Sequence, residues 1–174
     1  MKEKILLSIL FILTFFSGLF AESIGGFWKS IDEESGKARS LVAVYEYEGK
    51  YYGRIIGTFD DNGNKIDETI YSPKSRAPGV VGDPYYCGLD FIWDLKPKGY
   101  KYKGKIMDPR EGKVYTAELW VADDKLIVRG ELFIFGRNQT WLLAEDRDYP
   151  KGFKLPDVST FVPVIPEIKQ KDLE

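Results

Sequence analysis

Apolar and polar residues alternate with a period of two through most of residues 25–145, and turn-forming residues recur about every ten positions. This pattern is typical of an all-β sandwich or barrel. No stretch after residue 25 shows a convincing helical period. The sequence therefore predicts eight strands, at residues 25–31, 38–47, 51–59, 89–95, 100–107, 113–122, 125–135 and 139–145.

One hairpin tests this prediction, because residues that face each other across a hairpin share one face of the sheet. A two-residue turn at 123–124 gives four apolar or small pairs: Val121 with Leu126, Leu119 with Val128, Ala117 with Gly130, and Tyr115 with Leu132. The same register places Glu118 opposite Arg129 on the other face. We interpret these two charges as a cross-strand ion pair rather than as catalytic groups.

A second hairpin is expected around residues 48–50. A three-residue loop there pairs Tyr47 with Tyr51, Tyr45 with Gly53, and Ala43 with Ile55, which again makes one face apolar. Hairpin-linked strands with one apolar face leave no unpaired edge if they close into an up-and-down barrel. A two-sheet sandwich is the alternative architecture.

Loop length divides the connections of such a barrel into two ends. One end has tight turns, and the other collects residues 32–37, 60–88, 108–112 and 136–138. We expect this second end to be the mouth. Residues 72–86 hold three prolines and two glycines, so they are expected to be neither strand nor helix and to lie across the mouth as a lid.

The two ends of the chain differ from the barrel in composition. Residues 1–21 place Lys2 and Lys4 before an apolar run and then small residues, in the order of a secretory signal peptide cleaved after Ala21. The run is shorter than the ~20 residues of a membrane-spanning helix, so an anchor is the weaker alternative. Residues 22–149 form the predicted barrel domain, and residues 150–174, with four of the nine prolines, an extended tail partly packed outside it. We predict a periplasmic or secreted protein without a transmembrane segment after cleavage.

Composition excludes several kinds of chemistry. The chain has no histidine, which rules out a Ser-His-Asp or Cys-His triad and a His-ligated zinc. A net charge of -2 without a basic block gives no sign of nucleic-acid binding. Cys87 is the one cysteine, and we expect it to be a small buried apolar residue rather than a nucleophile.

Carboxylates offer the remaining routes to catalysis or metal binding. Asp108 lies in the 108–112 loop, where it is either a mouth carboxylate or simply the start of a hairpin turn. Oxygen ligands at 60–68 would suit calcium, but Lys65 occupies the position where an EF-hand loop needs glycine. No pair of acids is placed on one concave surface, as glycoside hydrolysis requires. We therefore predict no enzyme activity, no metal and no cofactor, and keep a hydrolase only as a distant third hypothesis.

The apolar face is rich in tyrosine, which combines apolar area with a hydroxyl and suits an amphipathic ligand. We predict a lumen that binds a small hydrophobic or amphipathic molecule through Tyr45, Tyr51, Phe91, Trp93, Tyr102, Tyr115, Asp108, Arg137, Gln139 and Trp141. The alternative is a solid core, since an eight-stranded barrel is only just wide enough to be filled by its own side chains. In that case the protein would be an envelope protein–protein interaction module that uses its loops or tail.

Six segments carry a family resemblance: GGFWKS at 25–30, VYEYEGKYYGRIIG at 44–57, GLDFIWDLK at 88–96, KGKIMDPREGKVYTAELW at 103–120, LIVRG at 126–130 and FGRNQTW at 135–141. Together they resemble the exported bacterial family called domain of unknown function 2147 (DUF2147). The resemblance implies a lipocalin-like β-barrel in the cell envelope, with no established activity. Relatives often carry two cysteines before the GL segment; here Cys87 stands alone, so no role of such a pair is carried over.

The start of the resemblance is similar to the G-x-W motif of lipocalins, with Gly26 and Trp28 in its two fixed positions. In lipocalins the tryptophan plugs the narrow end, and a late arginine stacks on it. The resemblance therefore implies that Trp28 and Arg147 close the barrel, and a guanidinium over an indole contributes roughly 0.5–2 kcal/mol. Trp28 as ordinary core is the alternative.

Overall fold

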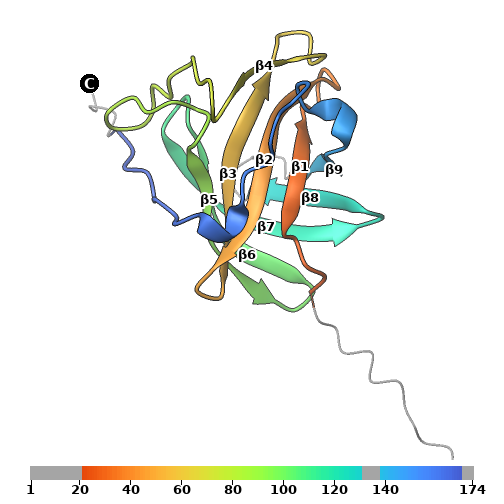
Figure 1. Cartoon of the computed structure of the whole chain (residues 1–174). Coiled ribbons are helices and arrows are strands. Elements are labelled where there is room, and N and C mark those ends of the chain that lie inside the picture. Colours follow the sequence, from red (N-terminus) through yellow and green to blue (C-terminus); the bar gives the residue numbers. More distant parts are fainter. Residues whose placement is uncertain (1–20, 131–137, 170–174) are drawn as a thin grey trace, which may run out of the picture.

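The structure of the chain is a computed structural model that describes residues 21–130 and 138–169 (Figure 1). The predicted signal segment and the last residues of the tail lie almost wholly outside this part. Its elements are β1 (Gly26–Ile31), β2 (Ala38–Tyr47), β3 (Lys50–Phe59), β4 (Ile66–Thr69), β5 (Asp90–Lys98), β6 (Lys101–Asp108), β7 (Lys113–Ala122), β8 (Lys125–Gly130), β9 (Asn138–Leu143), and the 3-10 helices η1 (Asp146–Asp148) and η2 (Val158–Thr160). In the described ranges, no helix is long and apolar enough to cross a bilayer.

Eight of the strands close into an antiparallel barrel in which neighbours in sequence are neighbours in space. The pairing runs β1-β2-β3-β5-β6-β7-β8-β9, and β9 returns to β1. The predicted up-and-down, lipocalin-like barrel is therefore confirmed, and the sandwich alternative is wrong. The short strand β4 was not predicted. It pairs with the end of β3 inside the long connection 60–88 and adds a ninth strand outside the closed ring.

The register of the β7–β8 hairpin is the predicted one. Val121 pairs with Leu126, and Ala117 with Gly130. Both residues of the turn 123–124 have positive φ, 50° and 58°, as a two-residue type I′ turn requires. Glu118 lies opposite Arg129 as predicted, but its carboxylate forms an ion pair with Lys101, whose Nζ donates a hydrogen bond to it at 2.9 Å. Leu132, the partner expected for Tyr115, lies outside the described residues.

The register of the β2–β3 hairpin differs from the prediction by one residue. The turn is two residues long, Glu48 and Gly49, both with positive φ, so Tyr45 pairs with Tyr52 rather than with Gly53. A slip of one residue moves every side chain to the other face of a strand. Tyr45 therefore lies on the outside of the barrel, while Val44, opposite Gly53, lies inside.

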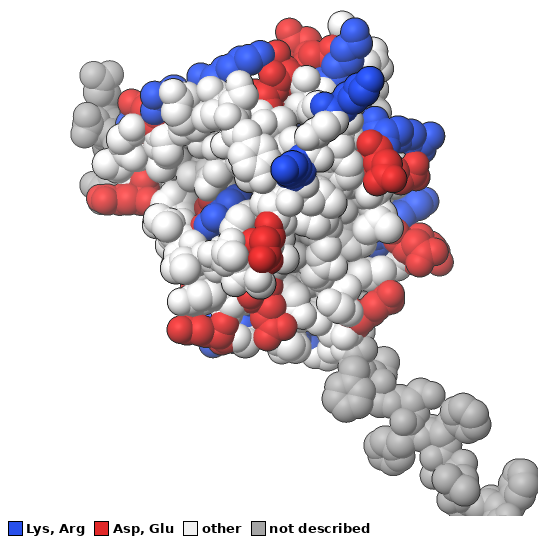
Figure 2. Space-filling view, viewed as in Figure 1, with Lys and Arg blue, Asp and Glu red and all other residues white. Residues whose placement is uncertain are grey.

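Strand β2 is buried on both faces because the end of the chain covers its outer side. We call residues 150–169 the C-terminal strap; in Figure 1 it crosses in front of β2 and β3. The strap and the segment before it pack on an outer apolar cluster of Leu41, Ala43 and Ile56. Figure 2 shows the same side of the molecule, where the centre is mostly uncharged and charged side chains gather at the upper edge and the flanks.

A buried ion pair fastens the strap to the barrel. Asp90 is 2% exposed, and its carboxylate accepts hydrogen bonds from Arg54 Nε at 2.9 Å, Arg54 Nη2 at 2.6 Å and the Tyr45 hydroxyl at 2.8 Å. The backbone N–H of Val164 in the strap donates to the same carboxylate at 2.8 Å. The Arg54 guanidinium lies 4.3 Å from the centre of the Phe161 ring. One carboxylate thus joins β2, β3, β5 and the strap.

The connection 72–88 lies against the loop between β6 and β7. The backbone N–H of Gly79 donates to the Pro109 carbonyl at 3.0 Å, and a Cβ on Gly79 would lie 2.2 Å from the Gly112 nitrogen. Only glycine fits at such a backbone crossing. The strap also holds this connection, because Val80 forms an isolated β-bridge with Ile168. As predicted, residues 72–86 form neither a helix nor a named strand.

Removal of the Asp90 carboxylate leaves the partly buried Arg54 guanidinium without its charged partner. We expect Asp90→Ala to lower the free energy of unfolding by about 3–5 kcal/mol, the usual cost of breaking a buried pair from one side. Urea denaturation measures the change. The matched control is Asp67→Ala, which removes an exposed pair with Lys74 and is expected to cost about 1 kcal/mol or less. Equal losses for the two variants would contradict the role assigned to Asp90.

Cys87 is buried, as predicted, and burial raises the pKa of its thiol to about 12. Because the thiolate is the reactive form, we expect no alkylation by iodoacetamide at pH 8 in the folded protein. In urea the thiol pKa returns to its ordinary range, and labelling is expected to be complete. Mass spectrometry reads the added mass, and rapid labelling of the folded chain would refute the assignment.

Candidate functional site

The barrel has a cavity of about 520 Å³, open to solvent, at the end that carries the long loops, and this volume is within the usual range of small-molecule sites. Its position agrees with the predicted mouth, because its walls come from the ends of strands that meet the connections 32–37, 60–88 and 108–112. The apolar part of the wall consists of Ile31, Ile55, Phe59, Tyr86, Phe91, Ile106, Met107, Pro109, Tyr115, Val128 and Trp141. The cavity thus offers aromatic and aliphatic surface on several sides.

The other half of the barrel interior is filled. Around the narrow end, side chains of Trp28, Leu95, Tyr102, Leu119 and Leu126 form one continuous buried cluster. The predicted alternatives of an open lumen and a solid core are therefore both present, in different halves of one barrel. An eight-stranded barrel has room for one layer of large side chains or for a ligand at a given height, but not for both.

Two carboxylate–guanidinium pairs stand at the cavity. Arg39 Nη2 lies 3.2 Å from Asp32 Oδ2, and Arg110 Nη2 lies 3.2 Å from Asp108 Oδ2. Asp32 and Asp108 precede turns, and each accepts a backbone N–H bond within its turn, from Ser35 and Arg110 respectively. Asp108 therefore both begins a turn and lies at the cavity.

The same hydrogen bonds stabilise the ionised form of both carboxylates. Hydrogen bonds from the hydroxyl and the backbone of Ser35 lower the pKa of Asp32 to about 2. Burial opposes ionisation of Asp108, but hydrogen bonds from the side chain and backbone of Arg110 outweigh it and hold the Asp108 pKa below its usual value. Both groups are anions at neutral pH.

Glu68 lines the cavity, whereas the sequence analysis considered it only among the possible calcium ligands at 60–68. It lies on β4, is 3% exposed and accepts hydrogen bonds from the Thr58 hydroxyl at 2.9 Å and the backbone N–H groups of Lys74 and Ser75 at 2.6 and 2.9 Å. Burial raises its pKa, but these donors together lower it below the usual value. The only sequence signal was the turn pair Asn62-Gly63 before a four-residue strand, too short to show a period.

Five of the predicted ligand-binding residues line the cavity: Phe91, Asp108, Tyr115, Gln139 and Trp141. The rings of Phe91 and Trp141 stack with their centres 6.2 Å apart. The indole N–H of Trp141 donates to Gln139 Oε1 at 3.2 Å. These residues come from β5, β6, β7 and β9, so the closed barrel brings together side chains that are far apart in sequence.

Four other predicted residues lie away from the cavity. Tyr45 is on the outer face, beneath the strap, with its ring 5.1 Å from that of Phe161. Tyr51 and Tyr102 contact each other in the filled half, with ring centres 5.1 Å apart. The register pairs Trp93 with Lys105, which is exposed, so Trp93 shares the outer face. Arg137 lies outside the described residues.

Trp28 and Arg147, which were predicted to close the barrel by stacking on each other, lie apart in the structure. Trp28 is buried in the filled half, and its indole N–H donates to the Ile24 carbonyl at 2.9 Å. Arg147 is exposed and pairs with Glu145 at 2.8 Å, because the chain turns back along the outside of β1 after β9. Trp28 thus belongs to the core, and the stacking partner expected for it lies elsewhere.

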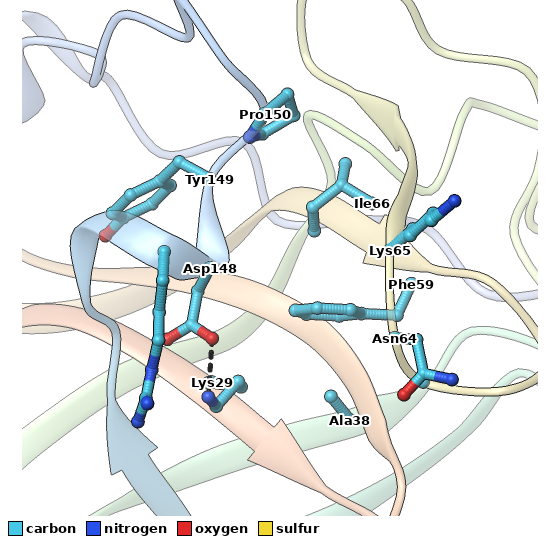
Figure 3. A pocket seen from close by; sticks show the side chains of 11 residues that line it. Lys29, Ala38, Phe59, Asn64, Lys65, Ile66, Asp148, Tyr149 and Pro150 are labelled. Carbon is cyan, nitrogen blue, oxygen red and sulfur yellow. Dashed lines mark hydrogen bonds and ion pairs between the residues drawn. The ribbon is translucent and has the colours of Figure 1, made fainter.

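A second hollow lies outside the barrel, where Arg147 and its neighbours meet the β3–β4 hairpin. It measures about 400 Å³, and Figure 3 shows Phe59 and Ile66 on one side and Tyr149 on the other. At its base Lys29 Nζ contacts Asp148 Oδ1 at 2.6 Å, so both charges are already paired. Its lining is partly polar and its Lys29 and Asp148 charges already contact each other, so it is a weaker ligand site than the aromatic cavity inside the barrel.

Metal binding has no support in residues 21–130 and 138–169, which contain no group of three or more His, Cys, Asp or Glu side chains placed to hold an ion. At the loop considered for calcium, the Asp60 carboxylate accepts the backbone N–H of Asn64 at 2.9 Å and closes a turn. This carboxylate therefore has a structural role.

Comparison with known proteins agrees with this architecture. No functionally curated protein matches the chain. Among solved structures, the chain is similar to protein HP1028 of the human pathogen Helicobacter pylori, which is described as belonging to the lipocalin family. The TM-score is 0.54 at 22% sequence identity, over 71% of this chain and 84% of that one, which supports the fold alone.

The sequence itself supports a more specific relationship. Residues 26–142 match the family described as "Uncharacterized protein conserved in bacteria (DUF2147)". The match begins at β1 and ends within β9, so it spans the whole closed barrel and stops before the strap. The chain therefore belongs to the DUF2147 family, as its sequence segments indicated.

Proposed function

We propose that this chain is an exported, non-catalytic protein that binds a small hydrophobic or amphipathic molecule in the cavity at the loop end of its barrel. The observation that carries the proposal is the cavity of about 520 Å³ beside a filled lower half. Large side chains pack together in the lower half, whereas the upper half has an aromatic wall beside open space.

The lining favours an amphipathic ligand. Phe91, Trp141 and Tyr115 offer apolar surface, and burial of an apolar ligand contributes about 0.8 kcal/mol for each buried CH₂ group. Arg39 and Arg110, each paired with one aspartate, stand at the same cavity and can orient a polar head group. The hydrocarbon part would then lie toward the filled half.

The absence of catalysis in this proposal rests on how the cavity carboxylates are held. A general acid or base works best with a pKa near the working pH. Asp108 and Glu68 instead have lowered pKa values, and their oxygens already accept hydrogen bonds from Arg110 and from Thr58, Lys74 and Ser75. Groups held in this way orient a ligand better than they transfer protons.

Export is supported by the order of residues 1–21, a short basic start, an apolar run and small residues. The closed barrel begins directly afterwards, with Gly26 as the first residue of β1. We propose that cleavage after Ala21 releases the barrel into the periplasm or the medium, with no metal or organic cofactor.

The second candidate function is a protein–protein interaction module. The observation that favours it is the strap, where Val162, Val164 and Ile165 are 61%, 69% and 53% exposed. Such a module would not need the cavity. A substitution inside the cavity therefore separates the two functions.

A pair of isoleucine substitutions tests the binding proposal. Ile106→Trp places an indole into the cavity, whereas Ile127→Trp adds the same bulk on the outer face, where Ile127 pairs with Trp120. We expect 1-anilinonaphthalene-8-sulfonate to bind the unchanged chain and the Ile127 variant with similar affinity, and the Ile106 variant at least tenfold more weakly. Fluorescence titration measures this, and thermal unfolding shows that both variants are folded.

Native mass spectrometry adds an independent result, because a lipid-sized mass retained through purification is expected for the unchanged chain and not for Ile106→Trp. Equal probe binding by folded forms of the two variants, with no retained mass on any chain, would refute the cavity as a binding site. That outcome would leave the interaction module as the better account.

A further inference from the structure

A basic surface covers the outer face of the strands β5 to β8. The register aligns Lys98 with Lys101 and Trp120 in one row across the strands. The next rows align Lys96 with Lys103, Glu118 and Arg129, and Lys105 with Thr116. These rows, all within the described residues, hold six basic side chains and one acidic side chain. We call them the lysine face: Lys96, Lys98, Lys101, Lys103, Lys105, Glu118, Trp120 and Arg129.

The lysine face is unusual for a chain whose net charge is -2. Like charges directly opposite each other destabilise a sheet, yet Lys96 faces Lys103 and Lys98 faces Lys101. Strands lie about 4.8 Å apart, so the rows span roughly 15 Å across four strands. Neighbouring strands within a row are closer together than the Debye length of about 10 Å at 0.1 M salt, so adjacent charges act together on a nearby anion.

Aromatic side chains stand beside these charges. Tyr100 is 56% exposed at the tip of the β5–β6 hairpin. Lys101 Nζ lies 5.3 Å from the centre of the Tyr100 ring and 4.3 Å from that of Trp120. Tyrosine and tryptophan favour the boundary between water and hydrocarbon, where one end of the ring is wet and the other apolar. Lysines extend their charge to the same boundary.

We propose that the lysine face is a docking surface for a bilayer that carries anionic lipids. Each lysine near such a surface strengthens binding about fivefold, and several acting together give stable but reversible attachment. Tyr100 would enter the head-group region at the hairpin tip. This attachment is separate from ligand binding, because no residue of the lysine face lines the cavity.

The shape of the surface favours a bilayer over a nucleic acid. The lysine face is the convex outside of a barrel, and none of its residues lines either of the two hollows described above. A nucleic acid is usually bound in a groove that follows its backbone or by an element inserted into the duplex. A broad, extended anion such as a lipid surface matches a convex charged face. The acidic turn at 123–124 lies beyond the end of the rows and marks the edge of the contact.

Two triple substitutions with the same change in charge test this proposal. Lys96→Gln, Lys98→Gln and Lys105→Gln together remove three exposed charges of the lysine face and leave the Lys101–Glu118 pair intact. The control combines Lys65→Gln, Lys151→Gln and Lys154→Gln, which are exposed elsewhere. Sedimentation with phosphatidylcholine vesicles, with or without phosphatidylglycerol, measures binding. Binding to vesicles of phosphatidylcholine alone is subtracted, because that binding does not depend on lipid charge.

We expect the unchanged chain and the control to bind the phosphatidylglycerol vesicles, and the lysine-face variant to bind them roughly a hundredfold more weakly. Binding is expected to fall as salt is added. The lysine-face variant is expected to unfold at the same or a higher temperature, because two like-charge contacts have been removed. Its loss of binding would then not reflect loss of folding.

Three results would overturn the proposal. The first is that the unchanged chain fails to bind anionic vesicles at low salt. The second is equal loss in the two triple variants, which would mean that total charge rather than the lysine face determines binding. The third is that the unchanged chain binds single-stranded DNA but not vesicles, and that the lysine-face variant loses this DNA binding. The partner would then be a nucleic acid. None of these results depends on whether the cavity binds its probe.

Discussion

Closure of the sheet is the constraint on which the rest of this structure depends. The pairing of β1 with β9, together with that of β2 with β3, leaves the ring of eight strands without a free edge. A ring of this size has an interior only just wide enough for its own side chains. Whether a given height of the barrel is solid or hollow is therefore decided by the size of a few inward side chains.

The two halves of the barrel differ in how their inward side chains use this limited space. In the narrow half, Tyr51 and Tyr102 meet ring to edge, and Trp28 satisfies its indole N–H on the Ile24 carbonyl. In the loop half, Phe91 and Trp141 stack on each other and form part of the cavity wall, and the space beside them stays open. The stability of the barrel can thus come from one half while the other is free to bind, which is why a cavity in so small a barrel is compatible with a stable fold.

The C-terminal strap extends the fold beyond the part shared with the DUF2147 family. It adds an outer apolar layer over β2 and β3, and Asp90 binds it to the barrel through the backbone N–H of Val164. The strap also reaches the connection 72–88 through the bridge between Val80 and Ile168. Because Ser75 and Tyr86 of that connection line the cavity, the end of the chain supports one wall of the binding site.

Local patterns determined most of the strands and one register. The Asp123-Asp124 turn and the single apolar face of β7 and β8 were compatible with one register of the hairpin, and the structure has this register. In β2 the run from Leu41 to Tyr45 is apolar at every position, so alternation did not distinguish its two faces. The turn at Glu48 and Gly49 then set a register one residue away from the predicted one, and Tyr45 moved to the outside.

The sequence by itself determined the class of fold, the family, the end of the barrel that carries the long loops, and five of the residues around the cavity. These follow from period-two alternation, turn residues and ordered motifs, which are all local. Only the tertiary structure decided that the strap covers β2, that Glu68 enters the cavity on β4, and that one half of the barrel is hollow. Those features depend on contacts between residues far apart in the chain and on the volume left between facing side chains, which no local pattern contains.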